Sequence, residues 1–411
     1  MAVRRSSPFS IHIPAGTLRK FLSILILLTS LSLGAREIDG SSLRVSLLTC
    51  SKGEDIASDF GHSAIRITDS ASGQDLVFNF GTYDFEAPHF VLKFMKGQMD
   101  YLLSVCYFKG FINSYLLENR AVHERELLLS PECRMKVYAY LVSLYNGPGC
   151  RYRYDYFRNN CATRIRDILL GEKSVVPPLE RPVYESEYTF RSAYGSLYLE
   201  DVPWLMFGLD LLMGSRLDRP ISFEEEMYLP CLLEKNLSKC RFADSGSPLL
   251  GEETLLLGNQ PVEKGKWAFL SGPVCVFSGV LLLLAVLLFF LRSKPCFMRG
   301  FSSLIHAIVG LTGVLLLLMW FATEHYWTGA NWNLLWASPL YLVPVFMREG
   351  QARDMVVYIL TGISILTISL QAFIPQPFNA AVIPMVAIMA LPAVGTYLNY
   401  VLSKKQITVK R

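Results

Sequence analysis

Residues 158–165 read RNNCATRI, a stretch in which Cys161 follows two asparagines and opens a predicted helix. Apolar residues then recur at helical spacing until Gly171, which is typical of a helix end. With Asn160 as the N-cap, Cys161 is the first helical residue, where free amide groups and the helix dipole stabilise a thiolate. The stretch therefore predicts a helix with one buried face and a nucleophilic thiol at its first position.

A histidine that could serve this thiol lies about a hundred residues earlier, where residues 60–67 read FGHSAIRI. The alternation predicts a strand over 62–68, and a second strand is predicted over 76–80 after a turn-rich segment. If these two strands pair, Asn79 shares a face with His62. A nucleophilic cysteine needs a base and the base needs an orienting partner, so we predict His62 as the base and Asn79 as its partner, with Asp84 as the second choice.

Each of these residues also has a structural explanation. Cysteine is among the most buried residue types, and disulfides persist in exported domains. An odd number of cysteines precedes the membrane segments described below, so at least one of them is unpaired. They are Cys50, Cys106, Cys133, Cys150, Cys161, Cys231 and Cys240, of which the last two are close enough in sequence to form a bridge. No zinc-binding spacing or phosphate-binding loop occurs in the sequence, so we expect neither a metal nor another cofactor.

The composition is that of a membrane protein, with 52% hydrophobic and only 18% charged residues. The small excess of positive charge does not indicate nucleic-acid binding, because the basic residues beyond Lys266 lie in loops between apolar stretches. Each apolar stretch is long enough, at about 1.5 Å per helical residue, to cross a hydrocarbon core of about 30 Å. Five such spans are predicted, at residues 267–291, 301–323, 326–346, 355–373 and 379–403.

The loop charges predict the orientation of these spans. Lys and Arg occur after the first span, after the third and at the C-terminus, and the other two loops have none. Basic loops are cytoplasmic by the positive-inside rule, which places the region before the first span outside. The predicted division is a signal peptide or membrane anchor at 1–35, an exported catalytic domain at 36–266, five membrane helices at 267–403 and a cytoplasmic tail at 404–411.

Several motifs between about residues 46 and 233 resemble the periplasmic domain of the Lnb-type lipoprotein N-acyltransferases. The motifs are GHS at 61–63, NFGTYDF at 79–85, YDYFRNNCATRIRD at 154–167, PW at 203–204, GLD at 208–210, LDRP at 217–220 and the EEMYLP stretch at 225–230. The order of histidine before cysteine, with the cysteine at a helix start, also resembles the circularly permuted papain-like enzymes, including the lecithin:retinol acyltransferase group.

The resemblance implies an α+β permuted papain-like exterior domain followed by an all-α transmembrane bundle in the bacterial inner membrane. It also implies transfer of an acyl chain from a phospholipid to Cys161, and then to the N-terminal amine of an S-diacylglyceryl-cysteine lipoprotein. His62 is then general base and later general acid, with Asn79 as its partner. Arg164 and Asn160, which neighbour the thiol, are the expected substrate-binding residues, with Arg164 suited to a lipid phosphate. The sequence does not indicate the oligomeric state.

Two other functions fit the same residues. An exported cysteine peptidase or amidase acting on cell-wall peptides would use the same thiol and base, but would need access to water. A membrane-anchored binding module would keep both residues without using them. The apolar segment 204–213 likewise has two interpretations, an acyl-facing surface or a buried helix face.

Overall fold

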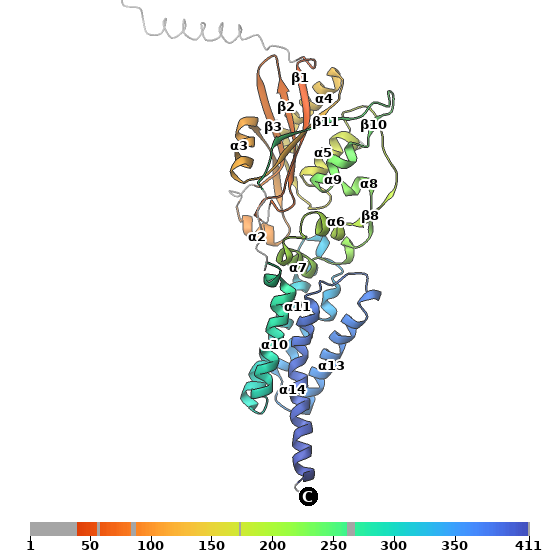
Figure 1. The fold of residues 1–411 in the computed structure, drawn as a ribbon. Coiled ribbons are helices and arrows are strands. Elements are labelled where there is room, and N and C mark those ends of the chain that lie inside the picture. Colours follow the sequence, from red (N-terminus) through yellow and green to blue (C-terminus); the bar gives the residue numbers. More distant parts are fainter. Residues whose placement is uncertain (1–38, 56–57, 84–87, 172–173, 261–267, 410–411) are drawn as a thin grey trace, which may run out of the picture.

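The computed structural model describes residues 39–409 except 56–57, 84–87, 172–173 and 261–267. It consists of an N-terminal domain of sheet and helices, residues 39–260, which stands on a helical domain, residues 268–409 (Figure 1). The predicted signal segment at 1–35 and the alternative partner Asp84 lie outside the described residues.

A seven-stranded antiparallel sheet forms the centre of the N-terminal domain, in the order β11-β5-β1-β2-β3-β4-β6. The strands are β1 Leu43–Cys50, β2 His62–Asp69, β3 Gln74–Tyr83, β4 Asp100–Tyr107, β5 Val122–Leu127, β6 Arg151–Arg153 and β11 Leu250–Leu257. Strands β2 and β3 pair with Ile65 opposite Phe78. The predicted strands at 62–68 and 76–80 are thus confirmed as neighbours.

Alternation along the strands gives the sheet two apolar faces. Ile65 and Phe78 point to the larger core, which is covered by α4 Pro131–Asn146, α5 Cys161–Leu170 and α9 Pro230–Leu237. Ala64 and Val77 point to the opposite face, which is covered by α3 Phe108–Leu117. Helices on both faces of the sheet exclude water from it, while its strand ends remain available for a site.

The N-terminal domain also contains short elements, some of which form a third, mainly aromatic core together with a side chain of the helical domain. The short elements are α2 Phe90–Met95, η1 Pro148–Cys150, β7 Leu179–Glu180, β8 Glu185–Thr189, α6 Phe190–Leu197, α7 Pro203–Leu212, η2 Ser215–Leu217, β9 Pro220–Ser222, α8 Phe223–Glu226 and β10 Arg241–Phe242. Trp327 of the helical domain belongs to this core, where its ring lies 4.9 Å from that of Phe157. The two domains therefore share buried side chains.

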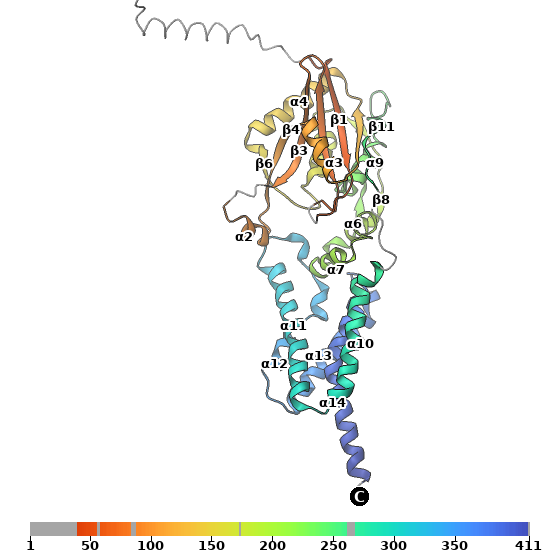
Figure 2. The same cartoon turned by 60° about the vertical axis from the view of Figure 1, so that its left-hand side comes forward.

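Among the residues that the structure describes, four helices are long and apolar enough to cross a membrane, and all four lie in the helical domain. They are α10 Pro273–Leu291, α11 Pro295–Phe321, α13 Gln351–Ser369 and α14 Val382–Val409, with η3 Ala268–Ser271 and η7 Gln371–Phe373 as short additions. In both views these helices run side by side below the N-terminal domain (Figures 1 and 2).

The predicted third span, 326–346, is not one long helix. It folds as η4 Tyr326–Thr328, η5 Trp332–Leu335, η6 Pro339–Leu342 and α12 Val343–Phe346. Proline removes a backbone donor, so Pro339 and Pro344 interrupt the helical ladder. The segment also packs closely on α11, where a Cβ on Gly310 would lie 2.7 Å from Leu342 Cγ.

The broken segment nevertheless passes from one end of the helical domain to the other. Near its start, the side-chain amide of Asn333 donates to the backbone carbonyl of Asp210 in α7 of the N-terminal domain. At its far end Arg353 donates to the carbonyl of Pro344 and to Ser302 Oγ, near the start of α11. Where the sequence predicts five helices, the structure therefore has four long helices and one segment of short helical turns.

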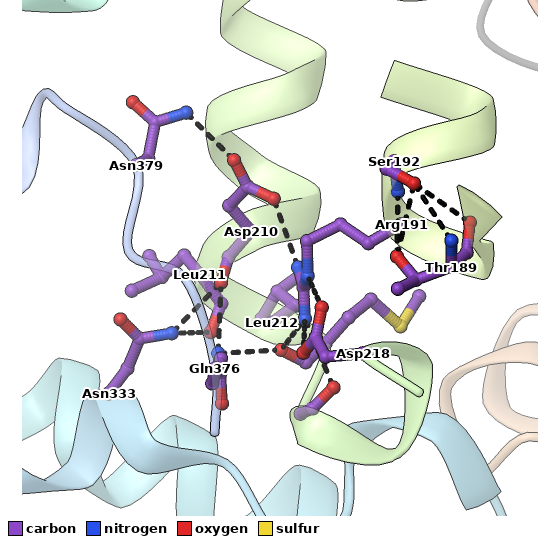
Figure 3. A network of polar contacts seen from close by, with 12 residues as sticks. Thr189, Arg191, Ser192, Asp210, Leu211, Leu212, Asp218, Asn333, Gln376 and Asn379 are labelled. Atoms are coloured by element: carbon purple, nitrogen blue, oxygen red, sulfur yellow. Dashed lines mark hydrogen bonds and ion pairs between the residues drawn. The ribbon is translucent and has the colours of Figure 1, made fainter. Parts of the chain in front are cut away.

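Helix α7 corresponds to the apolar segment 204–213. Phe207 and Asp210 are buried, and Trp204 packs on Phe277 of α10 while remaining partly exposed. Its C-terminal end is bonded to the helical domain by a buried polar network around Arg191 (Figure 3). The buried interpretation therefore describes the C-terminal half of this helix.

Candidate active site

The predicted site residues gather at one end of the sheet. His62 is the first residue of β2 and lies opposite Cys50, the last residue of β1. Asn79 and Gly81 lie in the C-terminal half of β3. Strands β3 and β11 also end at this end of the sheet, and α2 lies below it, next to the helical domain (Figure 2). The site thus lies at the end of the sheet that faces the helical domain.

Cys161 is the first residue of α5, as predicted. Asn160 is the N-cap, and its Oδ1 accepts from the backbone N–H of Thr163 at 2.9 Å. The Thr163 hydroxyl accepts from the N–H of Asn160 at 2.7 Å, which completes a capping box. Because α5 packs against β2 and β3, this cap fixes the thiol at the sheet end.

The Cys161 sulfur faces backbone amides of Ser63, Ala162 and Cys161 itself. Burial raises the pKa of the thiol, and these amides lower it by less. The resting side chain is therefore a neutral thiol, not the thiolate that the helix start alone predicts. The reason is that the surrounding side chains remove most of the water from around the sulfur, although the residue as a whole remains partly exposed.

His62 and Asn79 are brought together by the pairing of β2 and β3, with 3.3 Å between His62 Nε2 and Asn79 Oδ1. The Asn79 amide nitrogen donates to the carbonyl of Val77 at 3.3 Å, so its oxygen must face the ring. His62 Nε2 therefore carries the proton and donates it, which leaves Nδ1 as the basic nitrogen. Burial lowers the pKa of His62 to about 4, so the ring is neutral at pH 7.

The thiol lies beside the backbone of β2, the strand that carries the imidazole. The sulfur contacts the N–H of Ser63, the residue directly after His62. Among the contacts of the described residues there is no hydrogen bond between the ring and the sulfur. In unliganded enzymes the hydrogen bonds of catalytic groups are often long and tighten when substrate binds.

All nine cysteines are free thiols in the structure. Cys231 and Cys240, which the sequence allows to form a bridge, are unpaired; Cys231 lies in the first turn of α9 and Cys240 beyond its end. Cys161 is therefore available for chemistry. Within the described part of the chain, no group of three or more His, Cys, Asp or Glu side chains has the arrangement of a metal site.

Tyrosines for which the sequence predicts no role lie near the thiol. Charge on the sulfur would interact with Tyr152 and Tyr154, and the ring of Tyr154 packs at a tilt against that of Tyr101, with centroids 4.3 Å apart. The repeated tyrosines at 152, 154 and 156 were a possible signal, because alternate residues of an extended chain lie on one side. These rings form an aromatic wall beside Cys161, here called the tyrosine wall, and Cys161 itself remains partly exposed.

The two expected substrate-binding residues differ in their surroundings. Asn160 is buried, and its amide nitrogen donates to the carbonyls of Tyr156 and Tyr228. With its oxygen on Thr163, its side chain serves the fold, so the structure does not place Asn160 as a ligand for substrate. Arg164 is one turn from Cys161 and has a buried Nε with no hydrogen-bond partner. Its guanidinium lies 4.1 Å from the centre of the Tyr152 ring.

Gly81 lies in a bulge of β3 between Asn79 and Thr82 and has a φ of 88°. We expect Gly81→Ala to lower the reactivity of Cys161, and any turnover that depends on it, by about tenfold or more. The reason is that a β-carbon is strained at this φ. It would also lie 3.4 Å from the Tyr154 ring and 3.9 Å from Cys161 Cβ. The measurement is the rate of Cys161 alkylation together with turnover. Gly73→Ala, which has φ 73° in an open turn, is the matched control and should leave both rates unchanged.

Two family models match the chain, and they match its two domains. Residues 32–190 match the Lnb N-terminal periplasmic domain, and residues 264–406 match the Lnb transmembrane domain. The first match contains His62, Asn79 and Cys161, and the second contains the four long helices almost completely. No curated protein and no solved structure matches the chain.

Proposed function

Because the chain belongs to the Lnb family and is a membrane protein with a periplasmic domain, we propose that it is a cysteine-dependent lipoprotein N-acyltransferase. In this proposal an acyl chain passes from a phospholipid to Cys161 and then to the N-terminal amine of an S-diacylglyceryl-cysteine lipoprotein in the inner membrane. The observation that carries the proposal is the free thiol of Cys161 at a helix start. Its sulfur contacts the backbone amide directly after His62, whose neutral ring is oriented by Asn79.

In the first half of the reaction, His62 Nδ1 takes the thiol proton as the sulfur attacks the ester carbonyl of the phospholipid. The bond between that carbon and the glycerol oxygen breaks, and His62 returns the proton to the oxygen, which releases a lysophospholipid. The amides around the sulfur, at the positive end of α5, stabilise the charge on the carbonyl oxygen in the tetrahedral state. Cys161 then carries the chain as a thioester.

In the second half, the lipoprotein amine attacks the thioester carbonyl and the carbon–sulfur bond breaks. His62 takes a proton from the amine and gives it to the departing sulfur, which restores the thiol. Asn79 keeps the ring in the required tautomer throughout, since its oxygen holds the proton on Nε2. No cofactor is needed, because each step moves only an acyl group and a proton.

Transfer requires that water does not reach the thioester before the amine. The tyrosine wall around Cys161 supports this requirement, as does the position of the site at the sheet end that faces the membrane domain. Arg164 is the proposed contact for the lipid phosphate, because its buried Nε has no partner and it lies one turn from the thiol. The order of histidine on a strand before cysteine at a helix start also suits a permuted papain-like domain.

The test is to trap the intermediate on the full-length protein in phospholipid vesicles without acceptor. We expect the mass of one donor acyl chain on the peptide that contains Cys161, removable by hydroxylamine as a thioester should be. The same incubation with Cys161→Ala should give no adduct. Adding a diacylglyceryl-cysteine peptide should then discharge the chain to its N-terminus.

Other outcomes favour the other functions. Cleavage of cell-wall peptides without an acyl adduct would favour the peptidase. Normal lipoprotein N-termini in cells that contain only Cys161→Ala, with no adduct on the wild type, would favour the binding module. Both results contradict the proposed transfer.

A further inference from the structure

Helix α2, Phe90–Met95, exposes apolar side chains that the proposed chemistry does not use. Val91 is 67% exposed, Leu92 58% and Met95 61%, and the same short segment carries Lys93 and Lys96. Three large apolar side chains in one six-residue helix are costly to leave in water, so we expect another apolar surface to cover them. A short helix that combines apolar and basic residues is suited to the boundary between lipid headgroups and acyl chains.

The position of α2 identifies that partner. Its backbone is bonded to the residues that follow α11, with 3.1 Å between His325 Nε2 and the carbonyl oxygen of Phe94. The N–H of Glu324 donates to the carbonyl of Lys96 at 2.7 Å. Since α11 is an apolar span that ends at Phe321, these bonds hold α2 level with the outer end of a membrane helix.

The turn after α2 is built for this close approach. Gly97 has a φ of 80°, and a β-carbon there would lie 2.7 Å from the backbone nitrogen of His325. The Gln98 side chain donates to Glu324 Oε1 at 2.6 Å. In both views α2 lies at the lower edge of the N-terminal domain, beside the helical domain (Figures 1 and 2).

Two exposed aromatic side chains lie at the end of α11 to which α2 is bonded. Phe321 ends α11, and Tyr326 follows in the outer loop, and both are exposed. Aromatic residues at the ends of spans mark the interface between membrane and water. The apolar face of α2 is therefore continuous with the zone in which the headgroups of the outer leaflet lie.

We propose that α2 is an interfacial anchor whose residues Val91, Leu92 and Met95 insert into the outer leaflet of the membrane that α11 crosses. Lys93 and Lys96 then interact with anionic headgroups. Helix α2 connects β3 to β4, and β3 carries Asn79 and Gly81. Insertion therefore fixes one side of the thiol site to the leaflet from which a lipid donor would be drawn.

The test uses the photoreactive residue p-benzoylphenylalanine in the full-length protein, in vesicles of phosphatidylethanolamine and phosphatidylglycerol. We expect Leu92→p-benzoylphenylalanine to form a phospholipid adduct by mass spectrometry at least about tenfold more than the same change at Tyr107. Tyr107 is the matched control, because it is 71% exposed and ends β4, roughly 23 Å from the start of that strand beside α2.

Equal adduct yields at the two positions would overturn the proposal, as would a Leu92 adduct that forms only with an added lipoprotein. Crosslinking needs no turnover, so this result does not depend on the acyltransferase assignment. A second variant, Leu92→Glu with Met95→Glu, places two charges on the apolar face of α2 and should weaken its insertion. In this variant the yield of phospholipid adducts at Val91→p-benzoylphenylalanine should fall by about tenfold. Unchanged adduct formation in that variant would also contradict insertion.

Discussion

Replacing Cys161 with serine is expected to reduce the rate of acyl transfer by about a thousandfold or more. The reason is the protonation state of the pair. His62 is a weak base, with a pKa of about 4, and serves a thiol whose pKa burial has raised. The serine hydroxyl is far less acidic than a thiol, so the same imidazole cannot generate a useful nucleophile from it. The measurement is the initial rate of lipoprotein N-acylation at saturating phospholipid.

Cys150→Ser is the control for this change. Its sulfur donates to the carbonyl of Leu103 at 3.3 Å, a bond that a hydroxyl preserves, and it packs on the core that also contacts Cys161. We expect the control to keep most of the activity, and both variants to unfold at the wild-type temperature. A Cys161→Ser variant with more than about a tenth of wild-type activity would show that the sulfur is not the nucleophile.

The local parts of the site could be predicted from the sequence because short-range rules determine them. Alternation places Asn79 on the same face as His62 once two neighbouring strands pair, and a turn-rich link makes that pairing the simplest one. Asn160 is typical of an N-cap, which makes Cys161 the first helical residue. These rules need only residues a few positions apart.

The protonation state of the thiol could not be predicted in the same way. A helix start lowers the pKa of a cysteine, but burial of Cys161 raises it, and Tyr152 and Tyr154 are among the side chains that lie near the sulfur. That packing depends on how β6 and the segment after it join the edge of the sheet. Burial of the sulfur is thus a tertiary property, and it outweighs the local effect.

Tertiary contacts also separate the roles of Asn160 and Arg164. Both lie close to the thiol in sequence, but the Asn160 side chain donates to the backbone carbonyl of Tyr228, 68 residues away. This bond gives Asn160 a structural role. Arg164 has no comparable partner for its Nε. The third predicted span differs from one long helix for another reason: hydropathy counts apolar residues and takes no account of the backbone donors that Pro339 and Pro344 lack.

The second large effect is expected at Arg191, which lies at the junction of the two domains (Figure 3). Its Nη1 donates to Asp210 at 2.9 Å and its Nε to Asp218 at 2.7 Å, and all three side chains are almost completely buried. Its Nη2 also donates to the carbonyls of Met213 and Gly214. Arg191→Met would leave two buried carboxylates without their cation, and breaking a buried ion pair in this way costs about 3–5 kcal/mol.

That loss corresponds to a fall of roughly 10 °C in the unfolding midpoint of a domain of this size, measured by thermal scanning of the purified protein. Arg219→Met is the matched control. Arg219 pairs with Glu225 near the surface, and an exposed pair contributes about 0.2–1 kcal/mol, so its midpoint should fall by no more than a few degrees. Equal shifts for the two variants would contradict the importance of the buried network.

A further variant separates loss of the cation from loss of packing. Adding Asp210→Asn and Asp218→Asn to Arg191→Met removes the uncompensated charges, so part of the lost stability should return. Asp210 also accepts from Asn379, and its backbone carbonyl accepts from Asn333, both in the helical domain. If the network joins the domains, Arg191→Met should also expose the outer loops to proteolysis before the sheet unfolds. If it stabilises only the N-terminal domain, cleavage of those loops should begin at the unfolding midpoint and not below it.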